Sequence, residues 1–162
     1  MKVEDTQTFG KRQEFMAIAT MMARGCDVYL TLVDNQQIDC VVRHEDDQGA
    51  PMYYDVQIKG RSRQAQQASW GAWPNIRLVK PRERFFVVFY SEPFDQYWVI
   101  PSLEFVTLAS RTKTGRYVGH YSVTLAQNQE DGSPKYNQKF EEYRGAFHLL
   151  GASLVEPAGV RR

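Results

Sequence analysis

The run 85–90, FFVVFY, constrains the fold of this chain more than any other stretch. Six successive apolar residues leave no polar side for an element that lies at the surface. A run of this length fits a central strand that is buried on both sides. We therefore expect a sheet with helices packed on both of its faces, in an α/β fold. The run is also the longest apolar stretch in the chain, and it is far too short to cross a bilayer.

A single domain accounts for the length. With 162 residues, of which 43% are hydrophobic, the chain can bury one sizeable core. Its 20 Lys and Arg residues against 19 Asp and Glu give a net charge of +1, so any nucleic acid would have to bind a local basic patch. The first ten residues contain no apolar signal segment. We therefore expect a soluble, cytoplasmic protein with no membrane partner.

The sequence contains two cysteines, Cys26 and Cys40, both in apolar surroundings. They show neither CxxC spacing nor the Cys and His spacing of a zinc site. We therefore expect two small buried residues rather than a disulfide or a metal centre.

The first predicted element is a helix from about residue 9 to residue 24 with one buried stripe. The apolar residues that recur there at helical spacing are Phe15, Ile18, Ala19 and Met22. Glu14 lies four residues before Ile18, on the side of that stripe, and so borders the core. The simpler interpretation is that Glu14 complements the positive end of the helix dipole beside Lys11 and Arg12.

Two extended segments follow, 27–33 and 38–44, with the polar group DNQQ between them, which predicts a hairpin. In the second segment, strand alternation places Ile38 and Cys40 on one face and Asp39 on the other. An Asp between apolar neighbours at the start of a strand is more often a turn residue or an ion-pair partner than a ligand.

The next strand lies in the stretch 53–63, YYDVQIKGRSR. Alternation puts Gln57 and Lys59 on one face of it, while Val56 and Ile58 point into a core. A half-solvated edge strand shows the same pattern, and the stretch by itself favours that ordinary interpretation.

The remaining elements are predicted in less detail. We expect 64–75 to be a mobile loop with an exposed Trp70 or Trp73, and partly buried loop aromatics are an equal alternative. The other predicted elements are a strand over 97–100, a short helix over 101–108, a strand within 117–125, a loop over 126–137 and an amphipathic helix over 140–150.

The chain order brings together residue types that suit phosphodiester hydrolysis. That reaction asks for oxygen ligands that hold a hard cation, and for a positive group near the nucleophile or the developing charge. Asp39 and Gln57 offer the oxygen atoms and Lys59 offers the positive group. A glutamine carbonyl is uncharged, so metal affinity would rest chiefly on Asp39, helped by Glu14 through water.

A helical Glu, then an Asp, then Gln-x-Lys on the next strand resembles the PD-(D/E)XK nuclease superfamily, which has the restriction-endonuclease-like fold. The family includes Holliday-junction resolvases and some small homing endonucleases. The matching positions are Glu14, Ile38-Asp39 and Gln57-Ile58-Lys59. Two departures are the missing Pro before Asp39 and Gln57 in place of an acid. Both occur in parts of the superfamily, including a homing endonuclease branch with a Gln-x-Lys form.

The resemblance covers about residues 9–109 and implies an αβββαβ core, with a central mixed sheet flanked by helices. Residues 1–162 would form one such domain, with a strand and a helix added from about residue 110 to residue 162.

The resemblance also implies roles for the matched residues. Asp39 and Gln57 would bind Mg²⁺, or Mn²⁺ as its substitute, and Glu14 would join through water. Lys59 would position or help activate the attacking water. The expected function is a Mg²⁺-dependent DNA endonuclease, a hydrolase. The alternatives are a catalytically weak or inactive member that binds DNA or a protein, and an ordinary α/β interaction domain in which the motif is accidental.

Seven basic residues near the motif and in the segment RTKTGR are the expected contacts to DNA phosphates, although a solvated surface is the simpler interpretation for each one. They are Lys11, Arg12, Arg61, Arg63, Arg111, Lys113 and Arg116. Cutting both strands with one small site per chain is simplest for a homodimer or a higher even oligomer. Exposed aromatics and the C-terminal helix are the expected contacts.

Overall fold

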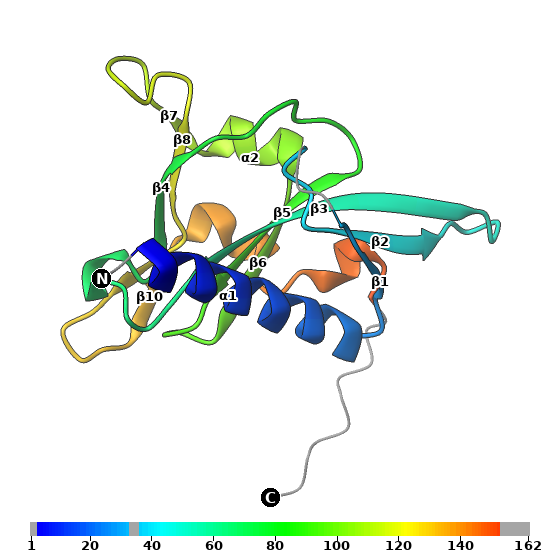
Figure 1. The fold of residues 1–162 in the computed structure, drawn as a ribbon, viewed down its shortest axis with the longest axis horizontal. Coiled ribbons are helices and arrows are strands. Elements are labelled where there is room, and N and C mark those ends of the chain that lie inside the picture. Colours follow the sequence, from blue (N-terminus) through cyan, green and yellow to red (C-terminus); the bar gives the residue numbers. More distant parts are fainter. Residues whose placement is uncertain (1–2, 33–35, 153–162) are drawn as a thin grey trace, which may run out of the picture.

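The computed structural model describes residues 3–32 and 36–152, with the side chains of residues 3–7 left aside (Figure 1). Its centre is a five-stranded sheet in the order β1-β2-β3-β5-β6. These strands are β1 (Asp27–Leu30), β2 (Cys40–Glu45), β3 (Pro51–Arg61), β5 (Phe85–Ser91) and β6 (Gln96–Pro101). Strands β3 and β5 pair in parallel and the other neighbours are antiparallel, so the sheet is mixed, as predicted.

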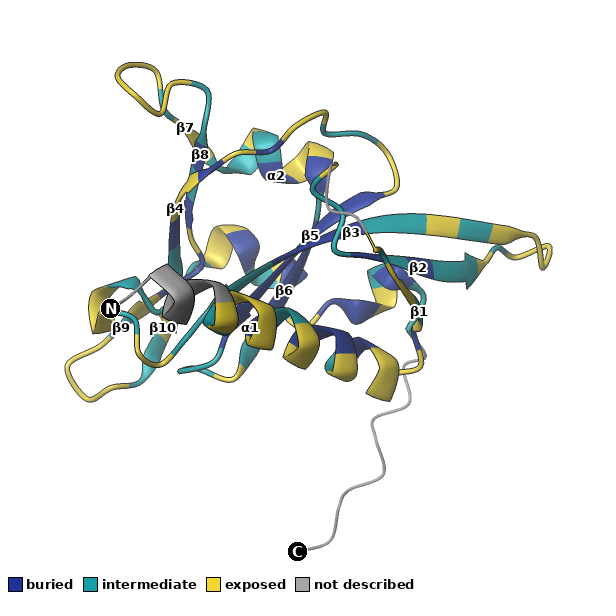
Figure 2. Cartoon of the chain, in the orientation of Figure 1, coloured by how far each residue is buried: buried dark blue, intermediate teal, exposed yellow. Residues whose placement is uncertain are grey.

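Strand β5 is the strand that the FFVVFY run predicts. Every residue of β5 is buried, which Figure 2 shows as a dark band through the middle of the molecule. Phe86 and Val88 belong to one apolar cluster, and Val87 and Phe89 belong to a second. Because alternate side chains point to opposite faces, the two clusters lie on the two sides of the sheet.

Helices cover both faces, as predicted, but on one face a small second sheet takes part. Helix α1 (Val3–Ala23) and the 3₁₀ turn η3 (Phe147–Leu150) contribute to the first cluster. The second face carries α2 (Ser102–Leu108), the 3₁₀ turn η2 (Gln138–Tyr143) and a three-stranded sheet. That sheet has the order β4-β8-β7, formed by β4 (Ala72–Ile76), β8 (Tyr121–Thr124) and β7 (Ser110–Arg111). Strands β9 (Ala126–Asn128) and β10 (Pro134–Tyr136) pair as a separate hairpin within the predicted loop 126–137.

The predicted αβββ order holds through β3, and the following elements differ in detail. A parallel pair of strands needs a crossover connection. Between β3 and β5 that crossover contains the 3₁₀ turn η1 (Gln67–Ser69) and β4, while the helix α2 follows β6. The expected exposure of Trp70 or Trp73 is wrong, and the alternative of partly buried aromatics holds for Trp70, which is partly buried. Trp73 is 4% exposed, and its ring lies 5.1 Å from Phe89 and 6.3 Å from Trp98. Burial of this indole holds the polar segment against the sheet.

Helix α1 begins earlier than predicted, and of the four residues of the predicted stripe only Ile18 is buried. The described buried residues of the helix are Gln13, Ala17, Ile18 and Met21. Phe15 and Met22, which were expected in the core, remain 54% and 58% exposed, and Ala19 is exposed as well. The register follows from Gly60 of β3, where an added Cβ would lie 2.1 Å from the Gln13 Cβ. Only glycine lets the helix approach the strand so closely at this point.

The predicted C-terminal helix over 140–150 is wrong, although the apolar pattern on which it was based does mark buried residues. The chain forms the two turns η2 and η3, separated near Gly145, whose φ is 65°. Gly145 N donates to Tyr97 O at 2.8 Å. This hydrogen bond to β6 interrupts the segment, so it does not form one continuous helix. The four apolar residues of the pattern are all buried: Phe140, Tyr143, Phe147 and Leu150. They cannot serve as the exposed contacts of an oligomer.

Cys26 and Cys40 are both free and buried, as predicted. Burial raises the pKa of the Cys26 thiol to about 11, against a partial opposing effect of the Arg24 charge. Within the two described ranges, none of the helices combines the length and the apolar character that spanning a bilayer requires.

Candidate functional site

Asp39 is held at the point where β2 separates from β3. Its backbone N donates to Val56 O at 2.9 Å, which continues the ladder between the two strands by one bond. Its carboxylate Oδ2 then accepts a hydrogen bond from Ile58 N at 2.6 Å. The side chain thus takes the place of the next backbone acceptor of β2. This fixes the carboxylate beside β3, between the positions of Gln57 and Lys59.

The start of β2 differs from the prediction, and the difference explains how Asp39 is oriented. The predicted strand ran over 38–44, with Asp39 on the face opposite Cys40, whereas β2 begins at Cys40. The Thr31 Oγ1 contacts Ile38 O at 2.8 Å and Asp39 O at 3.2 Å. These carbonyl groups are therefore turned toward Thr31. Asp39 lies just before the first residue of β2, at the end of that strand, and its carboxylate reaches the backbone of β3.

Gln57 is deeply buried on the face of β3 opposite α1, with 3% of its surface exposed. Its register partner on β5 is the fully buried Val87. The Gln57 Oε1 is buried and has no hydrogen-bond partner among the described residues. An unpaired buried oxygen is costly and calls for an explanation, and a bound cation or donor is one.

Lys59 follows Gln57 on the same face of β3 and is partly exposed. Within the described part of the chain its ammonium makes no ion pair and no hydrogen bond. This positive charge, on the strand next to Asp39 and Gln57, is therefore available to an outside group.

Glu14 approaches from the α1 face. Its Oε2 lies 2.5 Å from Lys11 Nζ, and its side chain is 23% exposed. Burial raises the pKa of the Cys40 thiol to about 12, and the charges of Asp39, Cys26 and Glu14 act in the same direction. Both carboxylates therefore lie near Cys40. Glu14 lies on the α1 face of the sheet, while Gln57 and Lys59 project from the other face.

The donor set suits a hard cation with few protein ligands. Within residues 3–32 and 36–152, no three side chains of His, Cys, Asp or Glu are grouped so that they could share a metal. A cation at this site would have Asp39 and the Gln57 amide oxygen, whereas Glu14, which was expected to join through water, lies on the opposite face of the sheet and is paired with Lys11. Mg²⁺ usually keeps several waters and binds one or two carboxylates, so these residues fit it.

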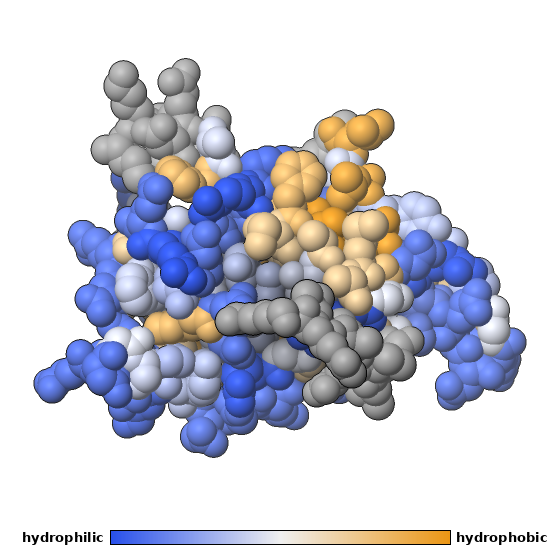
Figure 3. Space-filling view, turned by 90° about the horizontal axis from the view of Figure 1, so that it is seen from below, coloured by the Kyte–Doolittle hydropathy of each residue, from blue (hydrophilic) through white to orange (hydrophobic). Residues whose placement is uncertain are grey.

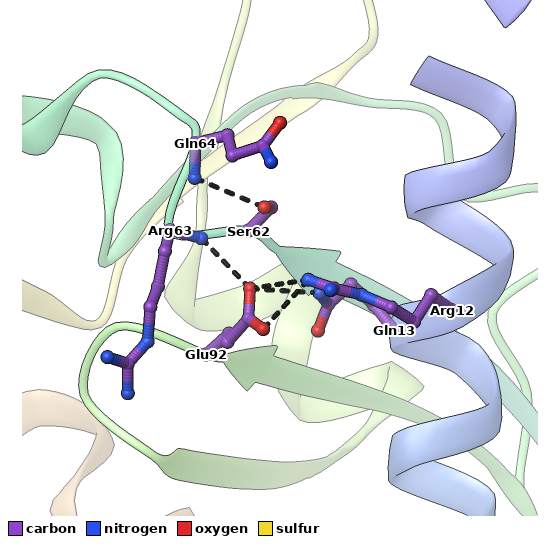
Figure 4. A network of polar contacts seen from close by, with 6 residues as sticks. All are labelled: Arg12, Gln13, Ser62, Arg63, Gln64 and Glu92. Atoms are coloured by element: carbon purple, nitrogen blue, oxygen red, sulfur yellow. Dashed lines mark hydrogen bonds and ion pairs between the residues drawn. The ribbon is translucent and has the colours of Figure 1, made fainter. Parts of the chain in front are cut away.

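Two of the predicted DNA contacts lie at a polar network centred on Glu92 (Figure 4). The Glu92 carboxylate accepts from Arg12 Nη2 at 2.8 and 2.9 Å, from Gln13 Nε2 at 3.2 Å and from Arg63 N at 3.0 Å. This network joins α1 to the residues that follow β3 and β5. Arg12 is therefore engaged within the molecule, while the Arg63 side chain extends away from the network.

Arg61 also has a role in the fold. Its Nη2 donates to Ala72 O at 2.5 Å and its guanidinium lies 5.7 Å from the Trp73 ring centre. Burial lowers the pKa of Arg61. Arg61 thereby fixes the crossover against β3, and Lys11 has Glu14 as its partner.

The segment RTKTGR lies at the loop between β7 and β8, which projects from the body of the molecule in Figure 1. Arg111, Lys113 and Arg116 are all exposed. Arg116 lies over the Tyr117 ring at 5.5 Å, and Arg111 over the Tyr121 ring at 5.8 Å. Arg12 and Arg63 thus meet at Glu92, whereas Arg111, Lys113 and Arg116 lie at the end of β7 and in the loop that follows it.

One basic stretch near the site was not predicted from the sequence. The segment 77–84, RLVKPRER, contains four Lys and Arg residues, the last of them Arg84 at its end, and connects β4 to β5. The sequence does show a high density of positive charge in this segment. Its closeness to Asp39 and Gln57 depends on contacts between distant parts of the chain, which the sequence pattern does not show.

No protein-family model matches this chain, and no curated protein matches it. One solved structure, described as a bacterial homing endonuclease, I-Ssp6803I, is similar with a TM-score of 0.59 and 21% sequence identity. The match covers 90% of this chain and 92% of that chain. At this identity the likeness establishes the fold, a mixed α/β architecture with a central mixed sheet.

The hydrogen bond from Ile58 N to the Asp39 carboxylate should contribute to the free energy of unfolding. Asp39→Ala removes the acceptor of the Ile58 N–H and should lower the free energy of unfolding by about 1–3 kcal/mol. Asp39→Asn keeps an oxygen acceptor and should be destabilised less. Urea unfolding of both variants measures the difference, and hydrogen exchange at the Ile58 amide locates it. An Asp39→Ala protein as stable as the wild type, with unchanged exchange, would contradict this.

Proposed function

We propose that this chain is a DNA endonuclease that hydrolyses phosphodiester bonds with Mg²⁺, or with Mn²⁺ in its place. The observation that carries the proposal is the Asp39 carboxylate, held 2.6 Å from Ile58 N between the positions of Gln57 and Lys59. The fold likeness to a bacterial homing endonuclease supports the same assignment. One fold hosts many functions, so it is the residues of the site that indicate the activity.

Each residue has a role that follows from its chemistry. Asp39 and Gln57 would hold the cation through oxygen. When bound, Mg²⁺ supplies Lewis-acid polarisation of a phosphate oxygen and lowers the pKa of bound water. Lys59 orients the attacking water and neutralises negative charge that develops on the phosphate. Hydrolysis forms a P–O bond to that water and breaks the P–O bond to the leaving sugar oxygen.

A second function, a nuclease-fold module that binds DNA or a protein without cutting, is favoured by one observation. Gln57 supplies no charge, so a single carboxylate, that of Asp39, would serve the cation. A site with fewer charges binds a divalent ion more weakly. Cleavage measurements distinguish this alternative from the enzyme.

The enzyme would act as a homodimer through an apolar surface formed by α1 and β1. This surface comprises Phe15, Met22, Leu30 and Leu32, with Leu32 fully exposed and the others more than half exposed. The two elements pack beside each other, and apolar side chains gather on the face shown in Figure 3. An extended apolar patch of this kind marks an interaction site. If two chains pair through these patches about a twofold axis, each patch covers the other. The dimer then has two catalytic sites, one for each DNA strand.

The catalytic proposal is tested with a pool of DNA duplexes of random sequence, so that an unknown sequence preference does not hide activity. Wild-type protein with Mn²⁺ or Mg²⁺ should produce new ends, measured by sequencing. Lys59→Ala and Asp39→Asn should each reduce cleavage by about 100-fold or more, because each removes a charge from the reaction centre. Asp39→Asn keeps the acceptor for Ile58, so its reduced cleavage is not caused by unfolding.

Matched controls come from exposed positions away from the site. Asp47→Asn, in the turn between β2 and β3, and Lys135→Ala, on β10, should cut as the wild type does. Equal cleavage by Lys59→Ala, Asp39→Asn and these controls would place the activity elsewhere. An absence of new ends with the wild type would favour the binding module.

The oligomer is tested by sedimentation velocity without DNA or metal. Wild-type protein should sediment as a dimer, and Met22→Glu with Leu30→Glu should yield monomers, because buried charges oppose association through an apolar surface. Val118→Glu replaces an equally exposed apolar residue in the loop between β7 and β8 and should leave the dimer intact. A wild-type monomer that still makes double-strand breaks would refute this arrangement.

A further inference from the structure

The basic segment 77–84 combines high charge with unusual backbone geometry. Arg77, Lys80 and Arg84 are exposed. Their side-chain cations form no hydrogen bond or ion pair within the described residues. Lys80 and Arg84 adopt positive φ values of 54° and 60°. Such a conformation is strained for residues other than glycine, so the surrounding contacts must impose it.

One set of contacts ties this segment to the chain just before Asp39. The Gln37 Nε2 donates to Arg77 O at 3.0 Å, and the Gln37 Oε1 accepts from Val79 N at 2.9 Å. A single amide thus holds the segment by two bonds, and Gln37 lies only two residues before Asp39.

A second set ties the segment to β3 just before Gln57. The Asp55 Oδ2 lies 2.5 Å from Arg82 Nη2, and Asp55 N donates to Arg84 O at 2.8 Å. Asp55 and Gln57 are on the same face of the strand, separated by two residues, which is about 6.7 Å. The Ser102 Oγ also bonds both Arg82 N and Arg82 O, at 3.0 and 2.8 Å. The segment is therefore fixed on both sides of the site.

The surface formed in this way can hold an anion. A hollow of about 280 Å³ is lined by Gln36, Val79, Lys80 and Arg82. The Asp55 carboxylate neutralises only the Arg82 charge. The three remaining cations are presented on a backbone whose position is already determined, so binding costs little ordering free energy.

We propose that the basic segment 77–84 binds the phosphates that flank the scissile phosphate in a DNA strand at the Asp39, Gln57 and Lys59 site. The inference depends on the proposed function for the position of the scissile bond. One strand of DNA carries a negative charge about every 3.4 Å of helix axis. The segment is attached to β3 at Asp55, about 6.7 Å along the strand from Gln57. At that spacing its cations reach the phosphates next to the scissile phosphate. Such contacts set the position of the DNA and carry no sequence information.

The positive φ values at Lys80 and Arg84 allow a test that removes charge without destabilising the fold. Glycine adopts positive φ without strain, so Lys80→Gly with Arg84→Gly removes two charges and should leave the protein at least as stable in urea unfolding. Binding of a fluorescein-labelled DNA duplex is followed by anisotropy in EDTA, where no cleavage interferes, over a series of KCl concentrations. Affinity should fall about tenfold or more. The slope of log affinity against log salt should become shallower by about 0.9 for each phosphate that the variant no longer neutralises.

Two controls accompany the variant. Lys80→Gly with Arg84→Lys restores one charge and should recover part of the salt slope. Lys135→Ala removes a charge from β10 and should change neither slope nor affinity. An unchanged slope for Lys80→Gly with Arg84→Gly, while the wild type binds DNA, overturns the inference and leaves the proposed function standing. A wild type that fails to bind DNA at low salt overturns both.

Discussion

The hydrogen bond from Ile58 N to the Asp39 carboxylate organises the candidate site. It exists because β2 begins only at Cys40 and so does not supply the next backbone acceptor for β3. The Asp39 side chain accepts that hydrogen bond instead. The bond places a carboxylate at the edge of β3, where Gln57 and Lys59 alternate to one face. Asp39 therefore completes the hydrogen bonding of the sheet, and in the proposed function the same carboxylate would bind the cation.

The burial of the sheet on both sides determines what surrounds that bond. Strand β5 is buried throughout, and its parallel partner β3 brings Gln57 beside Val87 in the interior. A buried amide oxygen with no protein partner is destabilising. In the proposed function a bound cation offsets this cost. Cys40 is buried nearby, and its burial, with the charge of Asp39 acting in the same direction, raises the pKa of the thiol.

The sequence predicts those features that depend on local pattern. The apolar run over 85–90 predicts β5, and alternation places Gln57 and Lys59 on one face of β3. Features that depend on contacts between distant residues were not predictable. Gly60 sets which side of α1 is buried, and Trp73 holds the crossover against β5. The basic segment 77–84 approaches the site through Gln37 and Asp55, contacts that periodicity does not reveal.

The central claim is that Asp39 and Gln57 share one cation, and calorimetric titration with Mn²⁺ in the presence of DNA tests it most directly. Gln57→Glu adds a negative charge with almost no change in length, so affinity should rise above that of the wild type. Asp39→Asn should weaken binding. If neither the wild type nor either variant binds Mn²⁺, or if Gln57→Glu binds no more tightly than the wild type, the shared metal site is contradicted.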